Sequence, residues 1–544
     1  MTTPAAWWKG AVIYECHLPS YRDGNGDGIG DLEGLILCLG YLKETLGIDA
    51  IWTGPFYTSP LLDQGFDVSG YTDVEPVFGT LDTFDRLIVE AHARGLRIIV
   101  DYIPNHTSDQ HPWFIESSSS RTDPKRDWYV WRDPAPGGGF PNNWTSEAGG
   151  SVWEFHEPTG QFYLHSHLKE QPDLNWRHPG VRSALLDVLR FWLDRGADGF
   201  RIDVAHMLMK DPGLRDNPEA PEGAANAYDL QHPDFGTQLH LYDRRHVDTH
   251  ATLAEIRAVV EEYPGAVTIA EIEAMTWEDW ADYYGEGLAG IHLPFPFRII
   301  ETPWLARSMR EELENLYAAL PAGGWPVLAL GNHDRVRLAT RLGPAQARVA
   351  AVLLLTLAVS PCLLYGDELG LVDQPVPFER QRDYFARAAG GVTRDPTRTP
   401  MPWNDQVNAG YSTADPADLW LPVGRDAAEV NVDAQLAEPT SFLSLYRVLL
   451  RLRTSSSALL HGEINFLPPE SQSESVLAYE RRDGLDHKLV LLNLGDDDAE
   501  CWVPAAGKVL AGASSRRVGE RVTGHLVLSA NEAIVVDVEK EVMP

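Results

Sequence analysis

Eight short apolar runs, separated by longer segments of helical periodicity, constrain the fold of this chain more than any other feature. Each run has the length and composition of a buried strand. The runs are Ala11–Tyr14, Ala50–Thr53, Ile98–Tyr102, Phe200–Val204, Val267–Ile272, Gly290–Pro294, Val327–Leu330 and Cys362–Tyr365. Because strands that alternate with helices form parallel sheets, this pattern predicts an α/β chain with a (β/α)8 TIM barrel.

The segments between the runs repeat apolar residues at helical spacing. Phe84, Leu87, Ile88 and Ala91 share one helical face, and Gly95 is placed to end that helix. A second helical stripe runs from residue 185 to residue 193. We therefore expect helices that cover the outside of the barrel.

Two segments interrupt the alternation. Residues 107–175 are rich in Trp, Gly, Pro and Ser and are too long for an ordinary strand-to-helix loop. After residue 460 the pattern changes to short strands joined by turns. We predict a catalytic barrel of residues 1–106 and 176–460, an inserted subdomain of residues 107–175, and a C-terminal antiparallel β-sandwich of residues 461–544.

The charge of the chain excludes some partners. A formal net charge of −34 argues against nucleic acids and anionic membranes, which are bound by basic patches. The N-terminal residues lack the features of a signal peptide, no stretch approaches about 20 apolar residues, and the four cysteines form no CxxC pair. We expect a cytoplasmic protein with reduced cysteines, either a monomer or a homodimer.

Charged residues in an otherwise apolar strand mark the first candidate site. In the stretch Gly199–His206, Arg201 and Asp203 alternate with Phe200, Ile202 and Val204. Because unpaired buried charge is costly, the pair needs a reason to be there. A purely structural ion pair at a strand end and a functional site both fit this stretch alone.

Other strand ends carry polar residues of the same kind. Asp101, Asn105 and His106 follow the third run, Glu271 ends the fifth, and Asn332, His333 and Asp334 follow the seventh. Loop capping is the alternative for the first group, ion pairing for Glu271, and Glu273 competes with Glu271 as an acid. Two or three carboxylates at the mouth of a barrel suit glycoside hydrolysis, in which one attacks the anomeric carbon and one protonates the leaving oxygen.

Oxygen-bearing residues alternate with glycine near the N-terminus. The loop contains Asp23, Asn25, Asp27, Ile29 and Asp31, much like the start of a calcium-binding loop. It lacks the distal glutamate of an EF-hand, and an Asx/Gly turn without metal is the alternative. We predict one structural Ca²⁺ site, which Mg²⁺ could also fill, and no organic cofactor.

Taken together, these stretches resemble the α-amylase superfamily of glycoside hydrolases (family 13), on the branch of the α-glucosidases and oligo-1,6-glucosidases. The resemblance runs from Trp7 to the end of the chain and rests on the strand-end motifs above. Gln171–Asn175 and Arg398–Met401 add signatures of that branch.

The resemblance implies roles for individual residues. Asp203 would be the nucleophile, Glu271 the general acid and base, and Asp334 the group that holds the 2- and 3-hydroxyls of the sugar. The implied substrate-binding residues are Asp63, Phe66, His106, Phe162, Arg201, His333 and Arg398, with Asp63 and Arg398 at the 4-hydroxyl side. Phe66 stands where relatives usually have Tyr, and Val204 after the nucleophile hints at α-1,6 preference.

The function that follows is a retaining, exo-acting α-glucosidase. It would hydrolyse short oligosaccharides and other α-glucosides through a β-glucosyl-enzyme intermediate that can also transfer glucose to a sugar. A sucrose hydrolase, a sucrose isomerase and a trehalose synthase use the same machinery and remain alternatives. Linkage preference and aglycone stay open at this point.

Overall fold

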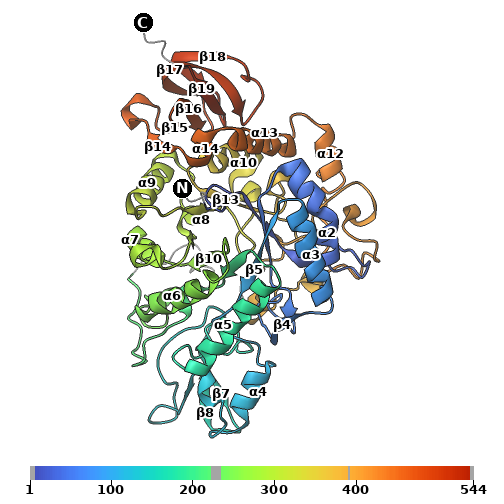
Figure 1. Cartoon of the computed structure of the whole chain (residues 1–544), viewed down its shortest axis with the longest axis vertical. Helices are drawn as coiled ribbons and strands as arrows, with labels where there is room; N and C mark the ends of the chain where they lie inside the picture. Colours follow the sequence, from blue (N-terminus) through green and yellow to red (C-terminus); the bar gives the residue numbers. More distant parts are fainter. Residues whose placement is uncertain (1–5, 222–234, 390–391, 540–544) are drawn as a thin grey trace.

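Eight parallel strands form the barrel in the computed structural model, which describes residues 6–221, 235–389 and 392–539 (Figure 1). Hydrogen bonds join the strands in the order β11-β10-β9-β5-β2-β1-β13-β12, and β11 contacts β12, so the barrel is nearly closed. The strands are β1 (Ile13–Cys16), β2 (Ala50–Thr53), β5 (Arg97–Tyr102), β9 (Gly199–Ile202), β10 (Val267–Ile272), β11 (Leu293–Pro296), β12 (Val327–Leu328) and β13 (Ser360–Leu364). The predicted barrel is confirmed, with shifts of a few residues at several strand ends.

The strands bury both of their faces. Side chains that point to the barrel axis form one hydrophobic cluster, which includes Trp52, Ile99, Ile269, Phe295 and Val327. Side chains on the other face pack against the surrounding helices. This burial on two sides explains why the strands read as continuous apolar runs rather than as alternating ones.

Helices surround the barrel as the periodicity predicts. Helix α3 (Leu81–Ala93) buries Phe84, Leu87, Ile88 and Ala91, and Gly95 follows it with a φ of +72°. The other long helices of the layer are α2 (Leu32–Gly40), α5 (Pro179–Asp194), α6 (Asp248–Val260), α9 (Ala306–Ala319) and α10 (Leu338–Thr356), and α13 (Phe442–Ser455) follows them. Each presents its apolar side to the strands or to a neighbouring helix.

The segment between β5 and α5 forms a separate unit at the lower end of Figure 1. It contains α4 (Pro112–Ser119) and a three-stranded sheet of β6 (Trp131–Arg132), β8 (Gln161–Leu164) and β7 (Trp153–His156). Bridges from His106 to Asp173 and from Tyr129 to Leu174 tie its two ends together just after β5. The insertion therefore lies next to the carboxyl ends of the barrel strands.

The C-terminal strands form one hydrogen-bonded, six-stranded antiparallel sheet, where a β-sandwich was expected. The strands are β14 (Glu463–Phe466), β15 (Val476–Asp483), β16 (Asp486–Asn493), β17 (Ala499–Gly512), β18 (Arg521–Leu528) and β19 (Ala533–Val538). Irregularities in β17 let its first part pair with β18 and its last part with β19. Strand β17 therefore joins β18 to the rest of the sheet.

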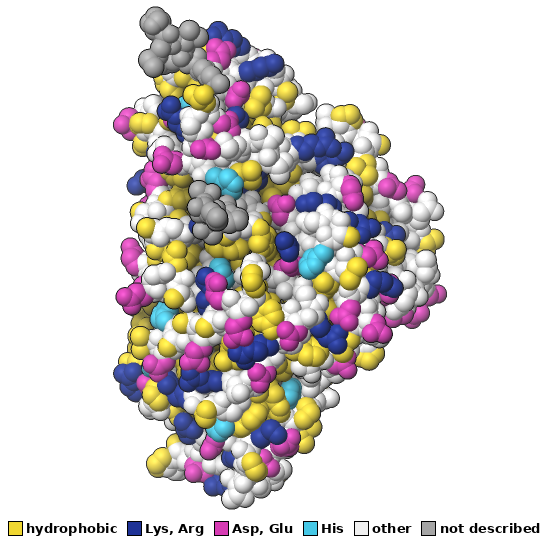
Figure 2. All heavy atoms as spheres, in the orientation of Figure 1, with side chains coloured by type: hydrophobic (Ala, Val, Ile, Leu, Met, Phe, Trp, Pro, Cys, Tyr) yellow, Lys and Arg dark blue, Asp and Glu magenta, His cyan; other side chains and the backbone are white. Residues whose placement is uncertain are grey.

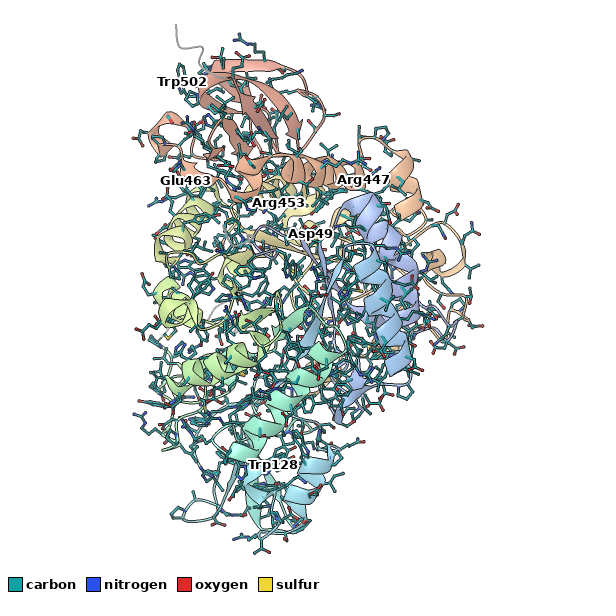
Figure 3. The ribbon with its side chains drawn as sticks, in the orientation of Figure 1. Asp49, Trp128, Arg447, Arg453, Glu463 and Trp502 are labelled. Atoms are coloured by element: carbon teal, nitrogen blue, oxygen red, sulfur yellow. The ribbon has the colours of Figure 1, made fainter. Side chains whose placement is uncertain are left out.

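A buried arginine links α13 to the amino end of the barrel. Arg453, labelled in Figure 3, donates hydrogen bonds to the carbonyl oxygens of Gly10, Leu355 and Leu357. Burial lowers the pKa of this guanidinium to about 9. The contact holds together the end of the barrel opposite the candidate site.

The surface carries charges of both signs. On the face that Figure 2 shows, acidic and basic side chains are interspersed rather than gathered into one patch. Within the described residues, none of the helices has both the length and the apolar character needed to cross a membrane.

Candidate active site

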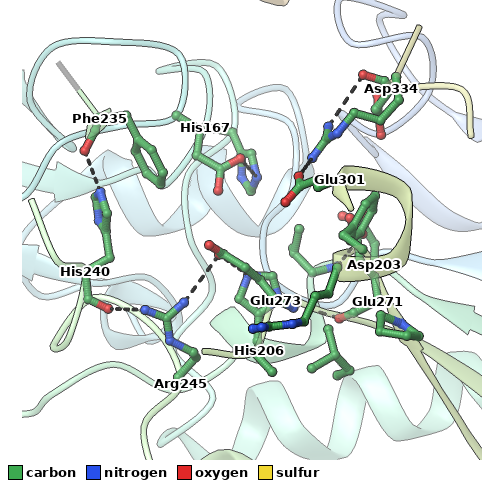
Figure 4. A pocket seen from close by; sticks show the side chains of 18 of the residues that line it. His167, Asp203, His206, Phe235, His240, Arg245, Glu271, Glu273, Glu301 and Asp334 are labelled. Atoms are coloured by element: carbon green, nitrogen blue, oxygen red, sulfur yellow. Dashed lines mark hydrogen bonds and ion pairs between the residues drawn. The ribbon is translucent and has the colours of Figure 1, made fainter. Parts of the chain in front are cut away.

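A cavity of about 460 Å³ opens at the carboxyl ends of the barrel strands. Most of the residues singled out at strand ends lie together in its wall, although they are far apart in the sequence. They are Asp63, Phe66, His106, Asp203, Glu271, His333 and Asp334. Figure 4 shows Asp203, Glu271 and Asp334 on one side of this cavity.

Arg201 is the buried cation at the centre of the site. Its Nη1 donates to Asp203 Oδ1 at 2.7 Å and to Asp101 Oδ1 at 3.0 Å, and its Nη2 donates to Glu271 Oε2 at 2.5 Å. Asp101 is completely buried and also accepts from the indole of Trp52 at 2.9 Å. One guanidinium therefore orients both carboxylates to which the chemistry was assigned.

The backbone turns sharply after Asp203. Strand β9 ends at Ile202, and Val204 has a φ of +35°, a conformation that a β-branched residue adopts only under strain. The amide of Val204 donates to Glu271 Oε2 at 3.1 Å. The strained turn and this hydrogen bond together fix Asp203 beside Glu271.

Burial raises the pKa of Asp203 well above its ordinary value. Arg201 acts against that shift, whereas the carboxylates of Glu271 and Asp101 add to it. Three carboxylates compete for one guanidinium, so a proton is retained in this group more strongly than in water.

Asp334 has the opposite electrostatic environment. Burial alone would raise its pKa, but the charges of His333, Arg394 and Arg398 hold it well below the usual range. Oδ1 of Asp334 accepts from Arg398 Nη2 at 2.7 Å and from Arg394 Nη1 at 2.9 Å. Asp334 is therefore ionised and fixed, as a group that grips hydroxyls needs to be.

Arg394 is a site residue that the sequence reasoning missed. It lines the cavity and bridges Asp334 to Asp63, whose Oδ1 lies 2.9 Å from Nη2, and Nη2 also donates to Asp383 Oδ1 at 2.8 Å. Asp383 is almost completely buried. The only signal in the sequence was an Arg–Asp pair at residues 394–395, four residues before the Arg398 to which this role was given.

Two other predicted contacts lie behind or away from the cavity. Arg398 is buried and supports Asp334 and the carbonyl of His333, so its guanidinium is not part of the cavity wall. Phe162 packs with Trp144, Val152 and Trp153 in the inserted subdomain. Because Phe162 sits in that cluster, the structure does not bring it to the predicted substrate site.

Phe66 and His106 complete the wall next to Asp63. The ring of Phe66 stacks on His333, with centroids 5.6 Å apart and an interplanar angle of 11°. Burial lowers the pKa of His106 to about 3, so the imidazole is neutral. Gln171 donates to Asp63 Oδ2 at 3.1 Å and lies 3.3 Å from His106 Nε2, which links the insertion to the cavity.

The far part of the cavity contains a second charged group. Glu273 accepts from Arg244 Nη1 at 2.9 Å and lies 3.5 Å from Arg245 and 3.4 Å from His206 (Figure 4). Burial would raise the pKa of Glu273, but the charges of Arg244 and Arg245 and a hydrogen bond with His206 lower it well below the ordinary value. A carboxylate held ionised in this way is a poor proton donor, which favours Glu271 as the acid.

The proposed metal loop is closed by its own hydrogen bonds. Asp23 accepts from the amides of Asn25, Gly26 and Gly28, while Asn25 Nδ2 lies 3.0 Å from Asp27 Oδ2. Burial raises the pKa of Asp31 to about 6, and the nearby carboxylates of Asp23 and Asp27 add to that shift. Such crowded acidic oxygens are a donor set that Ca²⁺ fits.

Carboxylates alone do not make this loop a metal site. Within residues 6–221, 235–389 and 392–539, no three His, Cys, Asp or Glu side chains are grouped as metal ligands. An ion would therefore depend on the amide oxygen of Asn25 and the carbonyl of Ile29 in addition to the carboxylates.

Comparisons with known proteins agree with this geometry. The family model described as "Alpha amylase, catalytic domain" matches residues 17–462. The "Probable alpha-glucosidase" of Rhizobium meliloti (strain 1021) is 40% identical over 514 residues, which cover 92% of this chain and 91% of that protein. The "Oligo-1,6-glucosidase" of Parageobacillus thermoglucosidasius is 34% identical, with 90% and 91% covered.

Solved structures give the same picture across the whole chain. The α-glucosyl transfer enzyme XgtA superposes with a TM-score of 0.92 at 37% identity, covering 98% of this chain and 100% of XgtA. The trehalulose synthase MutB from Pseudomonas mesoacidophila MX-45, as a mutant in complex with its substrate sucrose, superposes with a TM-score of 0.88 at 32% identity, covering 99% of this chain and 100% of MutB.

Proposed function

The chain belongs to the α-amylase family of glycoside hydrolases, and on that premise we propose that it is a retaining, exo-acting α-glucosidase. The substrates are the non-reducing ends of short α-glucosides, and the reaction passes through a β-glucosyl ester of Asp203. The relatives named above as α-glucosidase and oligo-1,6-glucosidase support this class of activity.

The two chemical steps follow from the contacts of Asp203 and Glu271. An Asp203 carboxylate, oriented by Arg201, attacks the anomeric carbon while Glu271 gives its proton to the leaving oxygen. Glu271 then takes a proton from water, which attacks the ester and releases glucose with retained configuration. The shared guanidinium keeps the two carboxylates close, which favours the short separation of retaining enzymes.

The observation that carries exo-action is the bridge from Asp63 through Arg394 to Asp334. Hydrogen bonds join these side chains to each other and to Asp383, and we infer that they close the cavity beyond the glucosyl position. A chain that continued past the 4-hydroxyl would collide with this bridge. Only a terminal glucosyl unit fits, held at its hydroxyls by Asp334, His333 and His106.

Glucosyl transfer is a second candidate, because the far part of the cavity offers room for an acceptor. Its wall contains Phe235, Trp280 and Phe297 together with the charged group around Glu273. The likeness to the α-glucosyl transfer enzyme XgtA favours an acceptor hydroxyl there in place of water. The likeness to the trehalulose synthase MutB, whose printed substrate is sucrose, makes sucrose a further candidate substrate.

We also propose that the loop of Asp23, Asn25, Asp27, Ile29 and Asp31 holds a structural Ca²⁺, in competition with Mg²⁺. The loop packs against a distant segment, since Ser412 donates to Asp23 Oδ2 at 2.5 Å and Gly28 accepts from the amide of Trp420 at 2.8 Å. A cation would stabilise this junction and would take no part in the chemistry.

The test is a substrate panel of maltose, isomaltose, sucrose and trehalose, with all products resolved by chromatography. The purified enzyme is compared with the Asp203→Ala variant as a blank. Glucose from maltose or isomaltose, released first as the α-anomer, is the expected result. Release of β-glucose contradicts the retaining mechanism, and release of nothing from all four sugars overturns the proposed function.

A further inference from the structure

A buried carboxylate that the assigned roles leave unused lies directly behind His333. Glu15 is at the carboxyl end of β1 and is 3% exposed. Its Oε1 contacts Nδ1 of His333 and lies 3.4 Å from the His333 amide. Its Oε2 has no hydrogen-bond partner among the described residues. Burying such a carboxylate costs free energy unless a positive charge lies next to it.

The imidazole of His333 faces a carboxylate on each of its nitrogens. Nδ1 contacts Glu15, and Nε2 lies 3.2 Å from Asp334 Oδ2. An ionised carboxylate only accepts hydrogen bonds, so each nitrogen that faces one has to carry a proton. Asp334 is ionised, because the guanidinium groups of Arg394 and Arg398 both donate to its Oδ1.

Among the residues that the structure describes, the other groups around His333 offer its ring no competing hydrogen-bond partner. Phe66 stacks on one face, and Trp52 packs edge-on with centroids 5.9 Å apart. Arg398 donates to the carbonyl of His333 and not to its ring. Burial lowers the pKa of His17 well below its usual range, so that neighbour is neutral.

Acidic groups on the neighbouring strands add to the negative field. Asp101 lies on β5 and interacts electrostatically with His333. Asp367, after β13, lies near Glu15, but burial raises its pKa to about 7, so it is only partly charged at neutral pH. Burial also raises the pKa of the Cys362 thiol, which is therefore neutral. The acidic side chains beside His333 are thus Glu15 on β1, Asp101 on β5 and Asp334.

We propose that Glu15 is a positioning residue that keeps His333 doubly protonated, with Nδ1–H on Glu15 and Nε2–H directed toward Asp334 and a hydroxyl of the bound glucosyl unit. The inference deepens the proposed function and rests on it for the identity of the substrate. As charge develops in the oxocarbenium-like transition state, a fixed imidazolium orders Asp334 and the hydroxyl it holds.

The direct test is the protonation state of His333 in the whole enzyme. With ¹⁵N-labelled histidine, the His333 signals are identified by their loss in the His333→Gln variant. Two similar ring-nitrogen shifts, as an imidazolium gives, are expected at neutral pH. One strongly displaced nitrogen, as in a neutral ring, overturns the proposal. This measurement is independent of which glucoside is the substrate.

Variants of Glu15 separate positioning from packing. Glu15→Gln keeps the shape and an acceptor for Nδ1 but removes the charge, and Glu15→Leu removes both. We expect kcat to fall about 10-fold in the first and about 100-fold in the second, the range of one charge-assisted hydrogen bond, with smaller changes in KM. The exposed Glu463→Gln change (Figure 3) is the matched control.

The outcomes distinguish the proposal from its premise. Wild-type kcat in Glu15→Gln, together with an unchanged ¹⁵N signature of His333, overturns the role of Glu15. If Glu15→Leu does not fold, the Glu15→Gln result still decides. A wild-type enzyme that cleaves no sugar of the panel contradicts the proposed function, while the ¹⁵N shifts still report on Glu15.

Discussion

Asp203 and Glu271 accept hydrogen bonds from the two terminal nitrogens of one buried guanidinium, that of Arg201, at 2.7 and 2.5 Å. Asp101 Oδ1 accepts a third hydrogen bond from the same guanidinium, at 3.0 Å. Three buried acidic groups share one positive charge. In the proposed mechanism, this arrangement keeps a proton available for the leaving group. It also destabilises the site when all three groups are ionised.

The first prediction is a gain in stability at the expense of activity. Replacing Asp203 by Asn removes one of three competing acids, and Arg201 keeps two partners. Because the folded pKa of Asp203 is raised, its contribution to stability is present at low pH and lost as the pH rises through that pKa. We expect Asp203→Asn to unfold at higher temperature than the wild type at pH 8, and the difference to shrink near pH 4.

The measurement is thermal unfolding followed by circular dichroism at both pH values. Asp211→Asn is the matched control, because the hydrogen bond from Arg215 gives that carboxyl a lowered pKa of about 2. A variant less stable than the wild type at pH 8 would show that Arg201 needs all three carboxylates.

The second prediction separates the nucleophile from the acid. Asp203→Ala should lose on the order of 10⁴-fold or more in kcat on every glucoside. Glu271→Gln should lose roughly 10²–10⁴-fold on maltose. With p-nitrophenyl α-glucoside, whose leaving group needs no proton, Glu271→Gln should still form the glucosyl enzyme in a burst.

Glu273→Gln provides the comparison for this experiment. It removes the competing carboxylate that Arg244 and Arg245 hold ionised, and we expect kcat to stay within about 10-fold of the wild type. Near-native hydrolysis of maltose by Glu271→Gln, with a large loss in Glu273→Gln, would transfer the acid role to Glu273.

Strand periodicity made the barrel and its strand ends predictable. Apolar runs of the correct length locate buried parallel strands, and the residue after such a strand has to lie at the carboxyl end of the barrel. That rule brought Asp203, Glu271 and Asp334 to one place without any knowledge of the loops between them. The function then followed from the motifs in which these residues stand.

Strand periodicity could not predict which loop residues line the closed end of the pocket. Arg394 lies in a long loop, 60 residues after its partner Asp334 and 331 residues after Asp63. The spacing of residues in a loop does not predict which of two nearby arginines, Arg394 or Arg398, reaches the cavity. For the same reason Phe162 could not be assigned, because its direction depends on how the small sheet of the insertion packs.

The third prediction concerns exo-action. Arg394→Lys keeps a positive charge between Asp63 and Asp334 but cannot bridge them with a planar fork. We expect kcat/KM for maltose to fall on the order of 10-fold or more, and the ratio of kcat/KM for maltotetraose over maltose to rise. Lysine is chosen because alanine would leave the buried Asp383 unpaired, at a cost of about 3–5 kcal/mol.

The control for this experiment is the exposed Arg516→Lys change, which should leave both substrates unaffected. If Arg394→Lys lowers both specificity constants by the same factor, the bridge binds the glucosyl unit but does not select chain ends.

The fourth prediction is a pH dependence of stability that comes from the buried carboxyl of Asp367. Burial raises the pKa of Asp367 to about 7, against the effect of Arg337 and with a contribution from Glu368. The folded protein therefore binds a proton that the unfolded chain releases between about pH 4 and 7, so this group's stabilisation is lost as the pH rises through that window. Asp367→Asn should flatten the dependence, as urea unfolding at pH 5 and at pH 8 would show. An unchanged slope would mean that Asp367 is ionised throughout.

The last prediction tests the metal loop through stability and turnover together. If Asp23, Asn25, Asp27, Ile29 and Asp31 hold Ca²⁺, a free concentration 100 times the dissociation constant adds about 2.7 kcal/mol to the free energy of unfolding. We expect chelation by EDTA to lower the unfolding temperature by several degrees while turnover at low temperature stays the same, because no residue of the loop lines the cavity.

The control for this experiment is a pair of variants. Asp27→Ala should remove the calcium response, whereas the exposed Asp433→Ala change should keep it. Restoration of the unfolding temperature by Ca²⁺ but not by Mg²⁺ would identify the ion, since the smaller cation demands near-octahedral geometry. Equal unfolding temperatures with EDTA and with Ca²⁺ would show that the amides of Asn25, Gly26 and Gly28 close the loop without a metal.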